Sequence, residues 1–582
     1  MLKTLGAQIK EFKKDSLLTP VFMVLEVLME MMIPLLMSSI IDDGVNAGNL
    51  KHIYITGGIM IVIACLSLSF GLLGAKYGAS ASTGFARNLR KAMYENIQTF
   101  SFSNIDKFST AGLVTRLTTD VTNLQMAYQM LLRMCVRSPI TLICAMCMTI
   151  FISPKLACVY LIAIIVLGSI LALITVKAHK YFSQAFPKYD DLNASVQENV
   201  SAIRVVKAYV REDYEKIRFT TASNSIYNMF VKAEGILAFN NPAMQLTVYS
   251  CIIAISWLGA NMIVSNTLTT GELMSALTYC MNILMSLMML SMVFVMLTMS
   301  VASAKRICEV LNEKSDLTNP EHPDYEVADG SIVFDHVTFR YNKTSSKPVL
   351  DDINLSIKSG ETIGIIGGTG SSKSSFVNLI SRLYDVNEGQ VLVGGKDVRT
   401  YDMDTLRNEV SVVLQKNVLF SGNIYENLRW GDKNATDEEC KRACQLACAD
   451  EFIERFPDGY NTHIEQGGTN VSGGQKQRLC IARALLKKPK ILILDDSTSA
   501  VDTATDAKIR KAFAEEIPNT TKLIIAQRIS SVQTADRIIV LNDGIVDGFG
   551  THEELLKTNA IYREVYESQT SGSGDFDEGG AE

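Results

Sequence analysis

The chain has 582 residues, of which 48% are hydrophobic, and it carries 55 Lys and Arg against 61 Asp and Glu, a formal net charge of −6. A chain of this length predicts several domains. Its acidic balance argues against a nucleic-acid partner, because such partners require a basic face on the protein. The long apolar runs all lie within the first 300 residues, so we expect two halves of different character.

Six apolar stretches are predicted to cross a membrane, since most have about the 20 residues that a spanning helix needs. They cover residues 20–41, 53–77, 138–152, 155–176, 246–264 and 273–300. The third is the shortest, and its helix is expected to begin further back, toward Met126. The first stretch is long and is followed by other spans, so no cleavable signal peptide is indicated.

Basic residues lie mostly on one side of these spans. Four lysines precede the first span and seven basic residues, Arg133 and Arg137 among them, lie between the second and third. The three predicted outer loops offer only Lys51 and Lys155. By the positive-inside rule, both termini and the second half are expected in the cytosol, with the chain in the cell membrane of a bacterium.

Two long polar stretches, residues 78–137 and 177–240, interrupt the apolar half. Structureless loops of about 60 residues are improbable in a compact protein, so each is predicted to be a cytosolic helical hairpin. Their turns are expected near residues 104–110 and 209–214. The predicted organisation is a transmembrane domain (1–305), a polar linker (306–330), a soluble α/β domain (331–568) and a disordered tail (569–582).

A loop rich in Gly and Ser follows a short apolar strand predicted at residues 362–366 and precedes an amphipathic helix. Backbone N–H groups of such a loop bind phosphates, its lysine reaches the terminal phosphates, and the next hydroxyl can ligate Mg²⁺. Ser372 stands where the phosphate-loop pattern has glycine; a positive φ there would cost roughly 1–2 kcal/mol. The loop comprises Gly367, Gly368, Thr369, Gly370, Ser371, Ser372, Lys373 and Ser374, with Ser375 next in the helix.

A second apolar strand, ILIL at residues 491–494, is followed by Asp495 and Asp496. A buried strand of this type carries one carboxylate, here Asp495, to the Mg²⁺ of a bound nucleotide. Together with the phosphate loop, this strand predicts an α/β domain whose cofactors are ATP and Mg²⁺.

Between these two motifs lies a pentapeptide that is followed by KQRLCIARAL and makes the chain resemble the ABC transporter family. It consists of Val471, Ser472, Gly473, Gly474 and Gln475. Six spans before one nucleotide-binding domain resemble a half-transporter of the type IV exporter class. The resemblance implies that Tyr341 stacks on adenine, that Gln415 contacts Mg²⁺ and couples to the membrane half, and that Asp502 closes the loop after the metal strand.

Three residues depart from the family pattern on one nucleotide site. Asp496 stands where the family has a catalytic glutamate, and its shorter side chain misplaces the carboxylate, which can cost on the order of 10²-fold in rate. Gln527 replaces the switch histidine, so it can bond to a γ-phosphate but cannot carry a proton. With Ser372, these residues predict a site that binds ATP and hydrolyses it slowly.

In the family, each ATP lies between the phosphate loop of one chain and the signature of another. The intact signature therefore predicts a second half-transporter as partner, as in heterodimeric bacterial multidrug exporters that move amphiphilic small molecules. Three alternatives stay open: a lipid or lipopeptide flippase, an ATP-binding regulatory subunit, and a homodimeric pump with weak ATPase. Glu26 and Glu30 share a face of the first span and would suit a cationic amphiphile, or bond to neighbouring helices.

Overall fold

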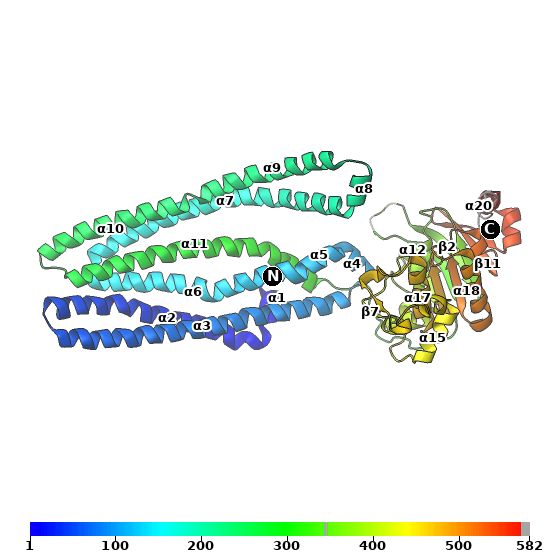
Figure 1. Ribbon diagram of the computed structural model, residues 1–582, viewed down its shortest axis with the longest axis horizontal. Coiled ribbons are helices and arrows are strands. Elements are labelled where there is room, and N and C mark those ends of the chain that lie inside the picture. Colours follow the sequence, from blue (N-terminus) through cyan, green and yellow to red (C-terminus); the bar gives the residue numbers. More distant parts are fainter. Residues whose placement is uncertain (343–344, 346, 572–582) are drawn as a thin grey trace. The chain divides into compact units, whose positions relative to one another are not determined.

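In the computed structural model, which describes residues 1–342, 345 and 347–571, the chain divides into two compact units. The first comprises Met1–Thr99 and Ser109–Glu313, and the second Phe100–Phe108 and Lys314–Glu582. The first consists of helices, and the second combines helices with β-sheets (Figure 1). The architecture agrees with the predicted fold class, a helical domain followed by an α/β domain.

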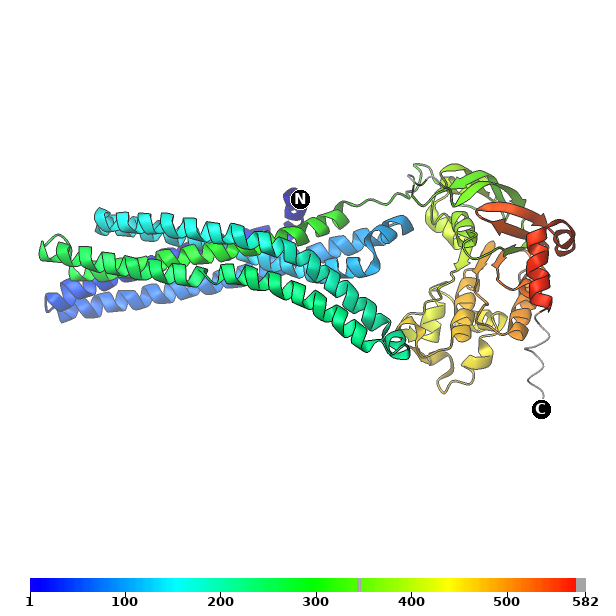
Figure 2. The same cartoon turned by 90° about the horizontal axis from the view of Figure 1, so that it is seen from above.

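Long helices lie side by side in the first unit (Figures 1 and 2). Among the described residues, six helical segments are long and apolar enough to cross a membrane, which confirms the number of predicted spans. The elements are α1 (Leu2–Gly6), η1 (Ala7–Phe12), α2 (Lys13–Ser39), η2 (Ile40–Asn46), α3 (Leu50–Gln98), α5 (Thr110–Thr115), η3 (Arg116–Asp120), α6 (Val121–Ile152), α7 (Pro154–Ser201), α8 (Ile203–Ala208), α9 (Glu212–Leu237), α10 (Asn240–Val264) and α11 (Thr270–Asn312).

The bundle core is apolar, and its buried tyrosines satisfy their hydroxyl groups on helix backbones. Tyr160 of α7 donates to the Ala276 carbonyl and Tyr279 of α11 to the Met31 carbonyl, both over 2.7 Å. A buried hydroxyl needs such a partner because its desolvation is otherwise uncompensated. These bonds join α11 to α7 and to α2.

Both polar stretches of the first half are helical in the structure. α3 runs unbroken through residue 98, and the chain returns through α5, η3 and α6, with α4 (Phe102–Phe108) at the first turn. In the second hairpin, α7 runs to Ser201 and is joined to α9 through α8. α4 belongs to the second unit, where the Tyr384 hydroxyl donates to Asp106 over 3.1 Å.

The last helix of the bundle continues to Asn312, whereas the sequence predicts a linker from residue 306. Two features keep it helical. Ile307 and Val310 are buried, and the Arg306 guanidinium binds the buried Asp120 carboxylate through bonds of 2.5 and 2.8 Å. The polar composition of this stretch therefore reflects pairing within the bundle, and the linker begins later than predicted.

The second unit is organised around a six-stranded sheet of order β12-β11-β3-β10-β9-β6, in which only β12 is antiparallel to its neighbour. These strands are β3 (Thr362–Ile366), β6 (Val410–Val413), β9 (Ile491–Asp495), β10 (Thr521–Ile525), β11 (Arg537–Asn542) and β12 (Ile545–Gly550). An antiparallel sheet, β2-β1-β4-β5, contains β1 (Ile332–Phe339), β2 (Leu350–Ile357), β4 (Glu388–Val393) and β5 (Lys396–Asp397). A short pair joins β7 (Gly422–Asn423) to β8 (His463–Ile464).

Helices cover the strands and create two cores. Ile491 and Ile493 of β9 pack into a core shared with α12, while Leu492 and Leu494 pack into another shared with α17. A parallel strand buried on both faces needs an apolar run of this kind. The helices are α12 (Lys373–Ile380), α13 (Met403–Glu409), α14 (Ile424–Leu428), α15 (Asp437–Leu446), α16 (Asp450–Ile453), α17 (Gly473–Leu485), α18 (Thr503–Glu516), α19 (His552–Thr558) and α20 (Ala560–Ser571).

The predicted disordered tail begins too early. α20 extends to Ser571, and Gln569 forms hydrogen bonds with the chain near residue 527. Residues 572–582, the rest of the predicted tail, lie outside the described residues.

Candidate nucleotide-binding site

Three loops with predicted functions leave the six-stranded sheet at one edge. The phosphate loop follows β3, Gln527 follows β10, and Asp496 follows β9. These strands are adjacent and parallel, with Ile525 of β10 aligned both to Ile365 of β3 and to Asp495 of β9. Because the carboxyl ends of parallel strands meet at one edge, side chains more than a hundred residues apart come together there.

The phosphate loop has the backbone geometry that its glycines suggest. Gly370 has a φ of 86°, and a Cβ on Gly367 would lie 2.2 Å from the Leu541 carbonyl oxygen. Ser372 adopts φ 72° and ψ 23°, in the left-handed region. The strain expected from a serine at this glycine position is therefore present in the structure.

Lys373 is held over this loop. Its ammonium group donates to the carbonyls of Gly367 and Gly368, both over 2.8 Å. Burial lowers the pKa of Lys373, and the nearby charges of Asp495 and Asp496 oppose that shift. A lysine pointed into the loop is where a phosphate-binding cation must lie.

A hydroxyl and a carboxylate meet beside the lysine. The Ser374 hydroxyl hydrogen-bonds to Asp495, whose side chain is almost fully buried at 5% exposure. Burial raises the pKa of Asp495, the Asp496 charge raises it further, and Ser374 and Lys373 oppose both effects. Oxygen donors of these two types fit Mg²⁺, which takes few protein ligands and keeps water or phosphate oxygens in its other positions. These residues therefore suit a magnesium nucleotide.

The two departures from the family pattern contact each other. The Gln527 side-chain amide donates to Asp496 Oδ2 over 2.9 Å. Asp496 itself has a φ of 49°, a left-handed conformation that Asp tolerates better than most residues. The sequence does not predict this hydrogen bond, because it depends on β10 lying beside β9.

Gln477, a buried residue of α17 with 6% exposure, is not among the predicted site residues. Its side-chain oxygen accepts from the Ala500 N–H over 3.0 Å, and its amide donates to the Asp496 carbonyl over 3.4 Å. Gln477 therefore links the helix of the signature to the loop after β9. Its position two residues after the signature was the only available signal.

The signature residues begin α17. Ser472 and Gln475 form a reciprocal capping box, which fixes the helix start. A Cβ on Gly474 would lie 2.7 Å from the Ala500 carbonyl oxygen, so this glycine permits the close approach of the loop after β9. Asp502 closes that loop as the N-cap of α18, accepting from the Thr505 N–H over 2.9 Å. This bond holds the pKa of Asp502 below its usual range.

Tyr341 and Gln415 lie at the borders of the site. The Tyr341 hydroxyl and Ser375 Oγ are 2.8 Å apart, and half of the tyrosine remains exposed, as a stacking surface for a base requires. Gln415 is an exposed residue in the loop after β6. In the part of the chain that the structure describes, no hydrogen bond joins it to Ser374 or Asp495, so its role as a metal contact stays a prediction.

A cluster of charges lies among the membrane spans. Arg137 of α6 binds Glu26 and Glu30 of α2, each over 2.8 Å. The sequence counts Arg137 among the cations between the second and third spans because the apolar stretch begins at residue 138. The helix was expected to begin further back, toward Met126, and α6 begins at Val121. One turn earlier on α6, Arg133 Nε is buried and has no hydrogen-bond partner among the described residues.

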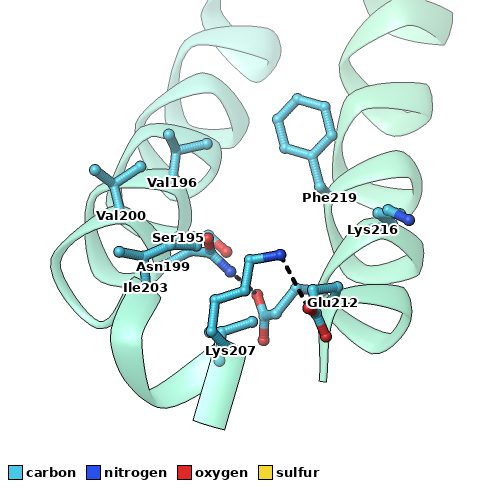
Figure 3. Close-up of a pocket in the computed structure, with 11 residues that line it drawn as sticks. Ser195, Val196, Asn199, Val200, Ile203, Lys207, Glu212, Lys216 and Phe219 are labelled. Atoms are coloured by element: carbon cyan, nitrogen blue, oxygen red, sulfur yellow. Dashed lines mark hydrogen bonds and ion pairs between the residues drawn. The ribbon is translucent and has the colours of Figure 1, made fainter. Parts of the chain in front are cut away.

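A separate pocket of about 310 Å³ lies at the tip of the second hairpin, between α7, α8 and α9 (Figure 3). Val196, Val200 and Phe219 form its apolar wall. The Lys207–Glu212 ion pair of 2.9 Å borders it. No motif of the sequence maps to this pocket.

Comparisons with known proteins agree with this arrangement. The family described as ABC transporter transmembrane region matches residues 17–288, and the family described as ABC transporter matches residues 350–499. The uncharacterized ABC transporter ATP-binding protein YfiB of Bacillus subtilis is 37% identical over 557 residues, covering 95% of this chain and 96% of the relative.

Two further matches extend the comparison. The ATP-dependent lipid A-core flippase of Desulfotalea psychrophila is 31% identical, over 89% of this chain and 91% of the flippase. The solved structure of a bacterial Atm1-family ABC exporter with ATP bound superposes with a TM-score of 0.84 at 24% identity, over 96% of this chain and 99% of the exporter. The chain therefore belongs to the ABC transporter family, as a multi-pass half-transporter with an exporter fold.

Proposed function

We propose that the chain is one half of a heterodimeric, ATP-driven exporter and that its own nucleotide site hydrolyses ATP slowly. The hydrogen bond between Gln527 and Asp496 carries this proposal. The Gln527 amide occupies Asp496 Oδ2, the carboxylate oxygen that would otherwise be open to the attacking water. The shorter side chain of Asp496 and the non-titrating side chain of Gln527 are also expected to slow ATP hydrolysis.

The partner is a second half-transporter. Within this chain the signature has a stable, capped start and leaves Ser472 and Gly473 exposed. That surface suits the nucleotide site of another chain, in which it would complete hydrolysis. We place the nucleotide-binding domain and both termini in the cytosol, on the strength of the basic residues in the inner loops.

The second hairpin also supports a partner. Its tip exposes Tyr209, Val210, Tyr214 and Ile217, each at least 60% accessible. A group of exposed apolar side chains marks a protein–protein contact surface, because exposing apolar area to water is unfavourable and a partner would bury it. They adjoin the pocket of Figure 3, whose apolar wall extends the surface available to a partner.

Turnover of ATP by the purified chain, alone and paired with its candidate partner in a lipid environment, tests this proposal. We expect turnover only in the pair, and its loss when the partner's catalytic glutamate is changed to Gln. Strong turnover by this chain alone would instead indicate a symmetric homodimeric pump, and it would overturn the slow-site assignment.

Substrates are proposed to be amphiphilic small molecules, and a lipid flippase is the second candidate. Arg137 pairs with both Glu26 and Glu30, and Arg133 lies one turn earlier on α6, so two cations accompany two carboxylates and the cluster has no net negative charge for a cationic substrate. Arg133 is the cation of this cluster without a hydrogen bond or ion pair among the described residues, which favours an anionic head group. The relative whose name includes lipid A-core flippase supports the same candidate.

The two candidates differ in what stimulates the pair. A flippase of anionic lipids should show ATP turnover that rises with an anionic phospholipid and not with a cationic amphiphile, and Arg133→Ala should remove the response while Arg133→Lys keeps most of it. Stimulation by cationic amphiphiles alone, unaffected by Arg133→Ala, would favour the multidrug exporter.

A further inference from the structure

The C-terminal helix α20 holds the backbone on both sides of Arg528. The Gln569 side-chain amide donates to the Gln527 carbonyl over 2.9 Å, and its side-chain oxygen accepts from the Ile529 N–H over 2.8 Å. One side chain therefore uses its donor and its acceptor on two backbone groups of the segment that carries Gln527. A backbone C=O and a backbone N–H are thus both satisfied, as they would be by a neighbouring β-strand.

α20 is itself fixed to the core of the domain. Tyr562 is fully buried, and its hydroxyl lies 2.7 Å from His552 Nδ1. Asn559, the residue before the helix, accepts from the Tyr562 N–H over 2.8 Å and donates to Asp547 over 2.7 Å. The position of Gln569 is thus set by packing outside the nucleotide site.

The rest of the segment is bound by α18. Arg510 donates to the Ser530 carbonyl over 3.0 Å, and the Ser531 hydroxyl donates to Asp506 over 2.9 Å. Neither contact reaches Gln527. Among the described residues, Gln569 is the side chain that holds the Gln527 carbonyl, and Gln527 in turn reaches Asp496.

We propose that Gln569 is a positioning residue for Gln527 and that α20 thereby sets how well this site distinguishes ATP from ADP. Gln527 has one amide with which to contact either Asp496 or a γ-phosphate, and its reach depends on where its backbone lies. ADP lacks the γ-phosphate, so its binding does not use this contact. The inference rests on the proposed function, since it takes Gln527 as the residue that contacts the γ-phosphate.

Three substitutions of Gln569 test its two hydrogen bonds, to the Gln527 carbonyl and from the Ile529 N–H. Gln569→Ala removes both hydrogen bonds. Gln569→Glu keeps the length and the acceptor for the Ile529 N–H, but places a carboxylate against the Gln527 carbonyl, where no donor remains. Gln569→Asn is one methylene shorter and cannot span both groups. Gln445→Ala is the matched control, because Gln445 is an exposed helical glutamine whose side chain has no bond within the described residues.

The experiment measures equilibrium binding of β,γ-imido ATP and of ADP, with Mg²⁺, to the full chain in lipid nanodiscs. We expect Gln569→Ala and Gln569→Glu to weaken binding of the ATP analogue about three- to tenfold, the effect of one hydrogen bond, with the glutamate variant the weaker binder. ADP binding should stay within about twofold of wild type, and Gln445→Ala should change neither.

Gln527→Ala separates this inference from the proposed function. If Gln527→Ala loses the preference for the ATP analogue while Gln569→Ala and Gln569→Glu retain it, the positioning role is wrong and the γ-phosphate contact stands. If Gln527→Ala also retains the preference, the γ-phosphate contact itself is wrong. Equal weakening of both nucleotides in the Gln569 variants, together with a lower unfolding temperature, would show a merely structural role and overturn the inference.

Discussion

Acidic side chains have different partners in the two units. In the helical unit, Glu26 and Glu30 share the Arg137 guanidinium in two ion pairs, and one oxygen, Glu26 Oε2, has no hydrogen-bond partner among the described residues. In the α/β unit, Asp495 has a hydroxyl and a nearby lysine, and Asp496 has a single amide donor. Oxygen lone pairs remain available there for a metal or a water molecule. The comparison shows that a membrane span requires charges to be paired internally, whereas a nucleotide site keeps acceptors for its ligand.

Removing Arg137 should have the largest effect, because it leaves two carboxylates without their cation. We expect Arg137→Ala to destabilise the helical unit by about 2–3 kcal/mol, less than the roughly 3–5 kcal/mol for a fully buried ion pair, because Arg137 and Glu30 are about a third exposed. Thermal unfolding of the purified chain in detergent measures this loss of stability. Replacing all three residues at once, with Glu26→Gln, Glu30→Gln and Arg137→Met, should recover much of the loss.

Arg133→Ala is the matched control for that prediction. Its guanidinium makes no ion pair among the described residues, so the loss of stability should be clearly smaller. Equal destabilisation by Arg133→Ala and Arg137→Ala would show that the ion pairs with Glu26 and Glu30 do not decide the stability of the bundle.

Restoring the family's residues at the nucleotide site that we propose to be slow should have the next largest effect on turnover. Asp496→Glu combined with Gln527→His should raise the turnover of the assembled pair by up to about 10²-fold, since it returns the carboxylate and a titrating group to the attacking water. The positive φ of Asp496, which glutamate tolerates less well, will reduce the gain. Each single variant serves as the control, and an unchanged rate in the double variant would contradict the slow-site assignment.

The apolar strands and the motifs that follow them could be predicted from the sequence, while the ligand-binding roles of their residues stay predictions. Ser374 of α12 bonds to Asp495 because the phosphate loop after β3 and the end of β9 lie at one edge of a parallel sheet. The Gln527–Asp496 bond could not be predicted, since motif spacing does not reveal that β10 lies between β3 and β9.

Other contacts were beyond sequence reasoning for physical reasons. The pairing of Arg137 with Glu26 and Glu30 depends on how α6 packs against α2, and no local pattern records helix packing. Gln569 was assigned to a disordered tail from the polar composition that follows it, yet buried Tyr562 shows that the helix is anchored from its start. Composition describes a segment on average and misses a single side chain that forms a specific contact.

Loss of the Tyr341 ring should have a moderate effect on the affinity for ATP. Stacking of a base on an aromatic ring contributes about 1–3 kcal/mol, so Tyr341→Ala should weaken ATP binding roughly tenfold. Tyr341→Phe keeps the ring and loses only the contact with Ser375 Oγ, and it should bind nearly as wild type. Equilibrium binding of ATP measures both, and an equal loss in the two variants would assign the effect to the hydroxyl.

The smallest expected effect concerns the backbone of the phosphate loop. Ser372 holds a φ of 72°, and a Cβ in that conformation costs about 1–2 kcal/mol, part of which Ser372→Gly should return as stability. The gain is limited to about 1 kcal/mol because glycine also gives the unfolded chain more freedom. Ser371→Gly is the control: the neighbouring serine lacks a positive φ and its side chain contacts Lys373, so the change should destabilise the domain. If Ser372→Gly stabilises the domain and also tightens ATP binding, the strain at Ser372 weakens nucleotide binding itself. If stability does not change, the positive φ of Ser372 does not cost the domain stability, and the prediction is wrong.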